Sequence, residues 1–302
     1  MKSQPCIFGE VLFDHFPDGR RVLGGAPFNV AWHLQAFDEA PLFISRVGAD
    51  GDGGAILEGM SDWGMSLAGM QTDAQLPTGR VGVSIEDDEP SYDIVRPAAW
   101  DAIEPPLAVP EMALLYHGSL ALREKKSRQA CQHLRDAGPS LVFIDVNLRS
   151  PWWRAEQVLE HIQGADWIKL NRFELDQLWP GTQNSRLRAE AMLKKYELRG
   201  LLLTHGSRGA ELFTHSGEHM ETRPGQDIVI KDTVGAGDAM AAVMVLGILR
   251  GWPPGRSLER AQDFASAMVG QRGATVRDMS FYRHFMDHWS SQDNTEGTSA
   301  QG

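Results

Sequence analysis

The chain has 302 residues, of which 42% are hydrophobic and 23% charged, as expected for a globular protein with one large domain. Its net charge of −11 and its lack of a strongly basic segment argue against nucleic acid or an anionic membrane as a partner. Two cysteines, and the absence of an apolar stretch behind a basic start, favour a reducing, cytoplasmic location. The longest apolar run, Ala239 to Leu249, is too short to span a bilayer.

The N-terminal part is predicted to hold a strand, a projecting flap and a helix. Ile7 to Phe13 reads as a buried strand, and Arg20 to Leu23 as a short second strand behind a turn. A glycine pair then precedes a helical pattern from Ala26 to Phe37. Asp14 lies at the end of the first strand and Asn29 in the first helical turn. Taken singly, the Asp is explained as a turn former and the Asn as a hydrogen-bond partner of the nearby backbone. Together they offer a carboxylate and an amide suited to binding sugar hydroxyls.

A small sheet is predicted to cover a site. Strands are expected within residues 81–96, and together with the flap at residues 11–23 they would form a lid. Between these segments lies a strand from Leu42 to Val47, followed by a glycine-rich loop that begins near Asp50. That loop resembles a calcium loop, but Ser61 stands where such a loop has its bidentate glutamate, so no calcium site is predicted.

From Ala113 onward, short apolar strands alternate with helical segments. The predicted strands are 113–116, 141–145, 167–170, 200–204 and 210–213, and the predicted helices are 124–137, 155–163, 171–179, 186–198, 258–269 and 281–289. This rhythm predicts an α/β fold, with a mainly parallel sheet covered by helices on both faces. Residues 1–290 would form one domain. The polar segment 291–302 is predicted to be a disordered tail.

Polar residues follow three of these strands, at the sheet edge where open α/β folds bind ligands. They are Asp145, Asn147 and Arg149 after the first, Asn171 and Glu174 after the second, and Thr204, Gly206 and Gly209 after the third. Asn171 and Glu174 are equally explained as a helix cap with an acid in the first turn. The third set is equally compatible with a plain hairpin turn. None of the ten histidines is assigned as a metal ligand.

The segment from Asp232 to Asp238 reads Asp-Thr-Val-Gly-Ala-Gly-Asp and runs directly into an apolar helix. Its glycines allow a tight turn, and the free amides at a helix start favour an anion. An acid beside an anion site is explained if Asp238 accepts the proton of an attacking hydroxyl during phosphoryl transfer, and the helix terminus is expected to keep it ionised. A plain helix cap is the alternative. Dinucleotide binding is disfavoured, because Met240 stands at the third glycine position.

Two motifs in the expected order make the sequence resemble the PfkB (ribokinase-like) carbohydrate kinases. The segment from Gly24 to Asn29 resembles the N-terminal signature of the family, and that from Asp232 to Asp238 its C-terminal signature. Phe8 to Asp14 and Tyr92 to Asp101 look like the fructokinase branch. The similarity extends from about Ile7 to about Arg277. It implies a ribokinase-like three-layer sandwich with a small β-sheet lid, and an ATP-dependent sugar kinase.

The resemblance also implies roles for individual residues. Glu174 would position Mg²⁺ through water, and Asp232, with the segment 273–275, would form a candidate K⁺ site. Arg149 belongs to a strand-end motif that contacts either sugar or phosphate. The other implied roles are Asp238 as catalytic base; Gly235, Ala236 and Gly237 as the anion hole; Asp14, Gly25, Asn29 and Arg96 as sugar contacts; and Asn171, Glu174, Thr204, Gly206 and Gly209 as ATP contacts.

The sequence departs from the family pattern at two places. The helix after Asn29 lacks the usual glycine at its end, and Asp263 stands where many members carry an asparagine near the adenine. The branch predicts phosphorylation of D-fructose at O6. A kinase of 2-keto-3-deoxygluconate or of another hexose is the alternative, and a non-catalytic sugar-binding regulator is a third hypothesis. A homodimer through the lid strands is also expected, because an unpaired strand edge invites pairing.

Overall fold

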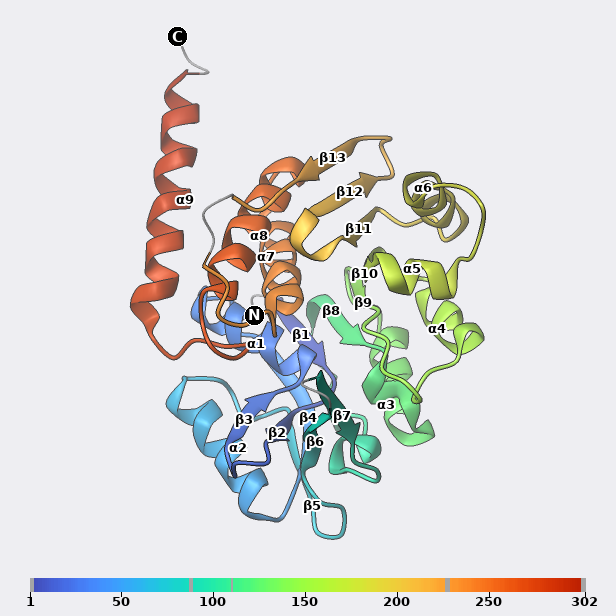
Figure 1. Ribbon diagram of the computed structural model, residues 1–302, viewed down its shortest axis with the longest axis vertical. Helices are drawn as coiled ribbons and strands as arrows, with labels where there is room; N and C mark the ends of the chain where they lie inside the picture. Colours follow the sequence, from blue (N-terminus) through green and yellow to red (C-terminus); the bar gives the residue numbers. More distant parts are fainter. Residues whose placement is uncertain (1–2, 87–88, 110, 226–228, 300–302) are drawn as a thin grey trace.

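The structure is a computed structural model that describes residues 3–86, 89–109, 111–225 and 229–299 (Figure 1). Its strands are β1 (Gln4–Phe8), β2 (Leu12–His15), β3 (Arg21–Gly24), β4 (Leu42–Gly48), β5 (Met70–Asp73), β6 (Gly79–Glu86), β7 (Glu89–Ile94), β8 (Met112–Gly118), β9 (Val142–Asp145), β10 (Trp167–Asn171), β11 (Gly200–Thr204), β12 (Ala210–Thr214) and β13 (His219–Thr222). Its helices are α1 (Ala26–Ala36), α2 (Gly51–Asp62), α3 (Lys125–Asp136), α4 (Ala155–Ile162), α5 (Arg172–Leu178), α6 (Ser185–Lys195), α7 (Ala236–Arg250), α8 (Pro254–Val269) and α9 (Met279–Ser299).

The main sheet has nine strands in the order β13-β12-β11-β10-β9-β8-β1-β4-β5. The pairs from β11 to β5 are parallel, and β12 and β13 add an antiparallel edge. This confirms the predicted α/β class. Because the parallel strands end at one edge, that edge collects the loops that follow β1, β9, β10 and β11.

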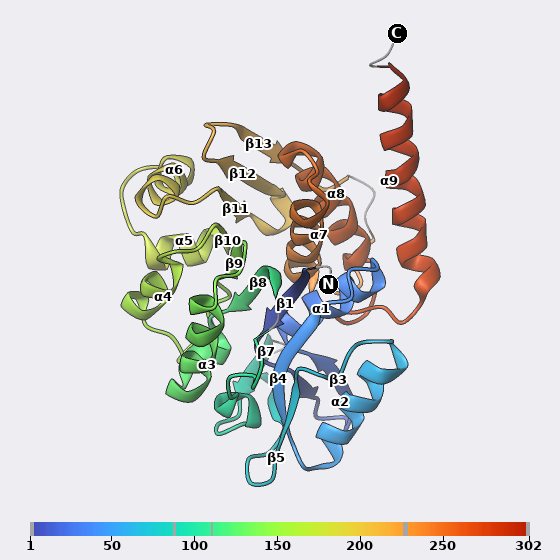
Figure 2. The same cartoon turned by 180° about the vertical axis from the view of Figure 1, so that it is seen from behind.

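Helices cover both faces of this sheet. Alternate residues of β11 show the division, since Leu202 packs in the cluster of α1, α7 and α8, whereas Leu201 and Leu203 pack with α4, α5 and α6. Figure 2 shows the two helical layers from behind. α7 is buried along Ala239–Gly247, so its N-terminus is anchored against the sheet. The start of α7 therefore lies beside the ends of the parallel strands, where Lys169 Nζ of β10 is 3.4 Å from a Cβ position of Gly237.

A second, four-stranded sheet in the order β3-β2-β6-β7 forms the predicted lid. One boundary differs from the prediction, because the expected strand from Ile7 to Phe13 is divided between β1 of the main sheet and β2 of the lid. At Gly9, where the chain leaves the main sheet, an added Cβ would lie 2.3 Å from Cγ of Pro27. Close packing against α1 therefore separates the two strands.

The C-terminal helix differs from the predicted disordered tail. α9 continues to Ser299 and extends beyond the rest of the molecule in both views, while residues 300–302 lie outside the described residues (Figures 1 and 2). Asp293 accepts hydrogen bonds from the guanidinium groups of Arg256 and Arg260, at 2.7 and 2.6 Å. These contacts hold the helix past Trp289, where the apolar pattern of the sequence ends.

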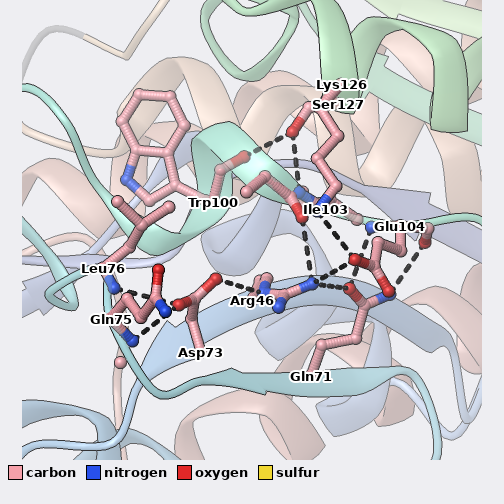
Figure 3. A network of polar contacts seen from close by, with 12 residues as sticks. Arg46, Gln71, Asp73, Gln75, Leu76, Trp100, Ile103, Glu104, Lys126 and Ser127 are labelled. Atoms are coloured by element: carbon pink, nitrogen blue, oxygen red, sulfur yellow. Dashed lines mark hydrogen bonds and ion pairs between the residues drawn. The ribbon is translucent and has the colours of Figure 1, made fainter.

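Arg46 joins the far edge of the sheet to the segment that follows the lid (Figure 3). Its Nε lies 2.9 Å from Asp73 Oδ2, and its Nη1 lies 3.3 Å from Glu104 Oε1 and 3.1 Å from the carbonyl oxygen of Ala102. In the glycine-rich loop after β4, Asp50 caps α2 by accepting from the amide of Gly53 at 2.8 Å. None of the helices in the described ranges has the length and apolar character needed to cross a membrane.

Candidate active site

The start of α7 is shaped by a glycine in the left-handed region. Gly235 has φ +80°, and an added Cβ would lie 2.4 Å from the Cα and Cβ of Ala274. The nearest backbone acceptor for the Ala236 amide is distant, at 3.4 Å from the carbonyl of Thr233. Within the described residues, the amides of Gly235 and Gly237 have no backbone acceptor. Free amides and the helix dipole favour an anion at this turn, which is the geometry that the predicted anion hole requires.

Asp238 lies in the first turn of α7 and is half-buried. Its Oδ2 accepts a hydrogen bond of 2.8 Å from Nδ2 of Asn29 in α1. Burial raises the pKa of Asp238, while Lys169 and Asn29 lower it. Desolvation, which the sequence prediction did not consider, is the largest influence on this pKa, and it acts against the helix terminus. The structure joins two predicted residues that are far apart in the sequence.

A buried ion pair beside Asp238 was missed by sequence reasoning. Lys169 Nζ lies 2.8 and 2.7 Å from the two carboxylate oxygens of Asp145, and Tyr116 donates to the same group at 3.1 Å. The Lys169 Nζ also lies 3.4 Å from where a Cβ of Gly237 would stand. One signal was available, since Lys169 is a charged residue between the apolar Ile168 and Leu170 of a predicted buried strand.

The proposed sugar residues meet where β1, the lid and α1 join. Gly25 caps α1 with φ +112°, and a Cβ there would lie 2.6 Å from the carbonyl oxygen of Glu10. Asp14 of β2 points toward this turn, because its Oδ2 is 3.6 Å from a Cβ position of Gly24. Burial raises the pKa of Asp14 to about 6. Asn29 is 4% exposed, and its Oδ1 has no partner among the described residues, so an acceptor remains for a ligand.

Glu10 is a buried acid at this junction that sequence reasoning placed inside a strand. It is 1% exposed, and its Oε2 has no partner in the described part of the chain. Burial raises its pKa to about 7, against the opposing influence of Arg149. Arg149 is exposed, and its charge also lowers the pKa of Asp14 and of Asp238. The charge of Arg149 therefore lowers the pKa of all three carboxyl groups, while its guanidinium itself donates to the carbonyl of Leu148 at 3.5 Å.

Arg96 lies apart from the other proposed sugar residues. It is exposed and forms an ion pair with Glu124, and its guanidinium carbon lies 5.5 Å from the ring centroid of Trp152. The structure thus brings Asp14, Gly25, Asn29 and Asp238 together but directs Arg96 elsewhere. A sugar contact from Arg96 would require its side chain to leave Glu124.

A cavity of about 760 Å³ lies beside the start of α7 and has the size of a small-molecule site. It is bordered by the amide turn of α7 and by the segments that follow β10, β11 and β13. Its lining includes six residues predicted for ATP or its phosphates: Asn171, Thr204, Gly206, Gly209, Ala236 and Gly237.

Asn171 and Glu174 form a reciprocal helix cap on α5. The Glu174 amide donates to Asn171 Oδ1 at 2.9 Å, and the Asn171 amide donates to Glu174 Oε2 at 2.8 Å. The Glu174 Oε1 accepts from the amide of Leu148 at 2.8 Å. A carboxylate offers about four lone-pair directions, so Glu174 retains acceptors for a water on a magnesium ion. These lone pairs fit a water-mediated metal, but Glu174 is 4% exposed and does not line the cavity, and the cap alone also explains the motif.

Asp232 ties two loops together beside the amide turn. Its Oδ1 accepts from the amide of Val234 and its Oδ2 from the amide of Gly273, both at 3.0 Å. These contacts bring the segment 273–275 to the start of α7, as the proposed K⁺ site requires. Both oxygens keep lone pairs, so the arrangement is compatible with a cation.

Gln262, and not Asp263, faces this cavity of about 760 Å³. Asp263 is exposed and is not part of the cavity lining, whereas Gln262 lines it and is 6% exposed. Its Nε2 donates to Ser266 at 2.9 Å, and its Oε1 has no partner among the described residues. The packing of α8 therefore turns Gln262, and not the neighbouring Asp263, toward the cavity.

Comparison with known proteins places this geometry in context. A family model for the pfkB family carbohydrate kinases matches residues 8–279. The fructokinase of Escherichia coli is 30% identical over 269 residues, covering 82% of this chain and 85% of that protein. The aminoimidazole riboside kinase of Salmonella typhimurium is 28% identical over 266 residues, covering 81% and 80%. The crystal structure of a fructokinase from Xylella fastidiosa with bound ATP has a TM-score of 0.81 at 19% identity, covering 96% of this chain and all of that one.

Proposed function

Because the chain belongs to the pfkB family of carbohydrate kinases, and so is a phosphotransferase that acts on a sugar hydroxyl, we propose that it transfers the γ-phosphoryl group of ATP to O6 of D-fructose. The observation that carries the proposal is the contact of Asn29 with Asp238 at the first turn of α7. It sets a carboxylate beside an amide turn that borders a nucleotide-sized cavity. The relatives described above favour fructose.

The chain's own residues divide the reaction between them. Asp238 takes the proton of the attacking hydroxyl, while Asp14, Gly25 and Asn29 hold the other hydroxyls of the sugar. The amides of Gly235, Ala236 and Gly237 receive negative charge on the transferred group. Asn171, Thr204, Gly206 and Gly209 hold ATP. Magnesium, positioned through water near Glu174, would supply further charge neutralisation when bound, and Asp232 would support a K⁺ ion.

The lid has two roles in this proposal. Closing of β2, β3, β6 and β7 over the sugar would exclude water, and Arg96 would then turn from Glu124 to the substrate. The lid edges would also pair two copies of the chain. A reducing, cytoplasmic location completes the proposal, since Cys6 and Cys131 are both free thiols.

A sugar acid such as 2-keto-3-deoxygluconate is a second candidate substrate. The observation in its favour is the exposed guanidinium of Arg149, whose charge acts on both Asp14 and Asp238. A guanidinium so placed can bind a substrate carboxylate. An Arg149→Met variant would lose turnover of a sugar acid far more than turnover of fructose.

A coupled assay of ATP consumption over a sugar panel tests the proposal. The panel contains D-fructose, other hexoses, 2-keto-3-deoxygluconate and aminoimidazole riboside, and the product is identified by NMR. Asp238→Asn keeps the shape of the side chain and should lower kcat by about 10²–10⁴-fold, with ATP binding retained. Transfer to none of these sugars, or full turnover in the variant, would refute it. Sugar binding without turnover by the wild type would support the regulator.

A further inference from the structure

A second cluster of ionisable side chains lies on the antiparallel edge of the main sheet. Glu211 of β12 stands opposite Glu221 of β13, and His219 precedes Glu221 by two residues. Alternate residues of a strand share a face, so the three side chains project together. One ligand atom from each lies within 4.8 Å of the others.

The side chains of the cluster are joined by close polar contacts. His219 Nε2 lies 2.8 Å from Glu211 Oε2 and 3.7 Å from Glu221 Oε1. The His219 ring stacks on Phe213, with centroids 4.7 Å apart and an interplanar angle of 20°. This stacking fixes the ring plane and directs Nε2 toward the two carboxylates. The edge of a tetrahedral zinc site with bonds near 2.1 Å is about 3.4 Å, so small rotations of the glutamates suffice.

A second histidine orients the central carboxylate. His205 Nε2 lies 2.7 Å from Glu211 Oε1, while Glu211 Oε2 faces His219. The side chains of His205, Glu211 and His219 are 12%, 16% and 14% exposed, so they are shielded from bulk water. Such a support for a ligand carboxylate is a common feature of metal sites.

An opening to solvent adjoins the cluster. A cavity of about 240 Å³ is lined by His205, Glu211 and Glu221, so an ion with a bound water has a path of entry. Three arginines also line this cavity: Arg172, Arg208 and Arg223. Their charges repel a free cation, but they would bind an anion that serves as the fourth ligand of the metal ion. The two glutamates offset the charge of a divalent ion.

We propose that Glu211, His219 and Glu221 form a binding site for a divalent cation of the zinc class, with His205 as a positioning residue. One imidazole and two carboxylates suit Zn²⁺, Co²⁺ or Ni²⁺, whereas Mg²⁺ prefers oxygen ligands alone. The site differs in every ligand from the proposed magnesium and potassium positions at Glu174 and Asp232. It uses residues to which the proposed reaction gives no role.

Metal titration of the full chain tests the site. Chelator-treated protein, free of nucleotide and Mg²⁺, is titrated with Zn²⁺ by calorimetry and with Co²⁺ by visible absorption. One equivalent should bind, with the absorption of a tetrahedral cobalt centre. His219→Gln and Glu221→Gln should each weaken binding at least 10-fold, and His205→Gln about 10–100-fold. His215→Gln is the matched control, because this exposed histidine lies on the same hairpin outside the cluster.

The outcomes separate this site from adventitious binding to other histidines. Zn²⁺ affinity that is unchanged in both His219→Gln and Glu221→Gln would overturn the proposal, as would equal loss in His215→Gln or no stoichiometric binding. The Glu221 side chain is 55% exposed, so its substitution is not expected to unfold the hairpin. Circular dichroism of each variant checks this.

Discussion

At the scale of single residues, one buried ammonium group faces three carboxylates. Burial lowers the pKa of Lys169, but the charges of three carboxylates together raise it: Asp145, which is in direct contact with it, Asp238 and Glu174. In return, Lys169 lowers the pKa of Asp238, against the larger effect of burial. The proton affinity of the proposed base therefore depends on a residue outside both family signatures.

Replacing Lys169 should move the pH dependence of the reaction. Asp238 must be deprotonated to act as a base, so kcat/KM falls as the pH drops through its pKa. Lys169→Met removes an influence that lowers this pKa, and the acid limb of the profile should move to higher pH. Lys169→Arg keeps the charge and is the control. Measured profiles with the same acid limb in the wild type and the Met variant would contradict the prediction.

At the scale of elements, the start of α7 depends on a backbone conformation that a side chain would prevent. Gly235 at its N-terminus and Gly251 at its C-terminus both have positive φ, at +80° and +67°. They differ in their surroundings, because a Cβ at Gly235 would overlap Ala274, whereas a Cβ at Gly251 would meet nothing within 4 Å. Alanine substitutions at these two glycines therefore distinguish the cost of backbone strain, present at both, from the cost of steric overlap, present only at Gly235.

Gly235→Ala should cost more stability and activity than Gly251→Ala. The left-handed conformation costs an alanine about 1–2 kcal/mol at either site. Overlap with Ala274 adds about 1–3 kcal/mol at Gly235 and should displace the amides proposed to receive the phosphoryl group. Urea unfolding and kcat/KM for the best sugar measure the two effects. Equal losses in both variants would show that the turn does not need the close approach of Ala274.

The last turns of α9 give a further prediction at this scale. Arg260 is 2% exposed, and its guanidinium donates to Asp293 at 2.6 Å and to the carbonyl of Trp289 at 3.0 Å. Asp293→Asn should lower the free energy of unfolding by about 1–3 kcal/mol, because the buried guanidinium of Arg260 loses its counterion. The loss is limited because the Asp293 side chain is 41% exposed. Asp287→Asn, at an exposed position of the same helix, should be neutral. Equal urea midpoints for the wild type and Asp293→Asn would count against this role.

At the scale of the whole molecule, the features that could be predicted from the sequence are those set by residues close together in the chain. The strand–helix alternation, the lid segments and the amide turn at Gly235 all follow from periodicity and turn chemistry within a few residues. The pairing of Asn29 with Asp238 spans 209 residues, and that of Asp145 with Lys169 spans 24, so neither is visible as a spacing. Burial of Asp238 depends on the same long-range packing. Its raised pKa was therefore not predictable from the helix dipole alone.

Contacts between distant segments explain the two places where the observed secondary structure differs from the predicted one. A strand pattern from Ile7 to Phe13 cannot reveal that Pro27 packs against Gly9 and divides it. A polar tail after Trp289 reads as disordered until Arg256 and Arg260 are seen to bind Asp293. In each case a contact from a distant segment decides the local structure.

The lid edge gives the last prediction, which concerns assembly. β7 is an edge strand of the lid, and Tyr92 on it is 55% exposed, as expected for an aromatic residue that packs in a contact between two copies. Light scattering should give the mass of a dimer for the wild type. Tyr92→Lys should shift the mass toward that of a monomer, because it places a charge in the contact. Leu107→Lys removes a fully exposed leucine outside the lid strands and should leave the dimer intact. A monomeric wild type, or a dimer unaffected by Tyr92→Lys, would exclude this edge as the interface.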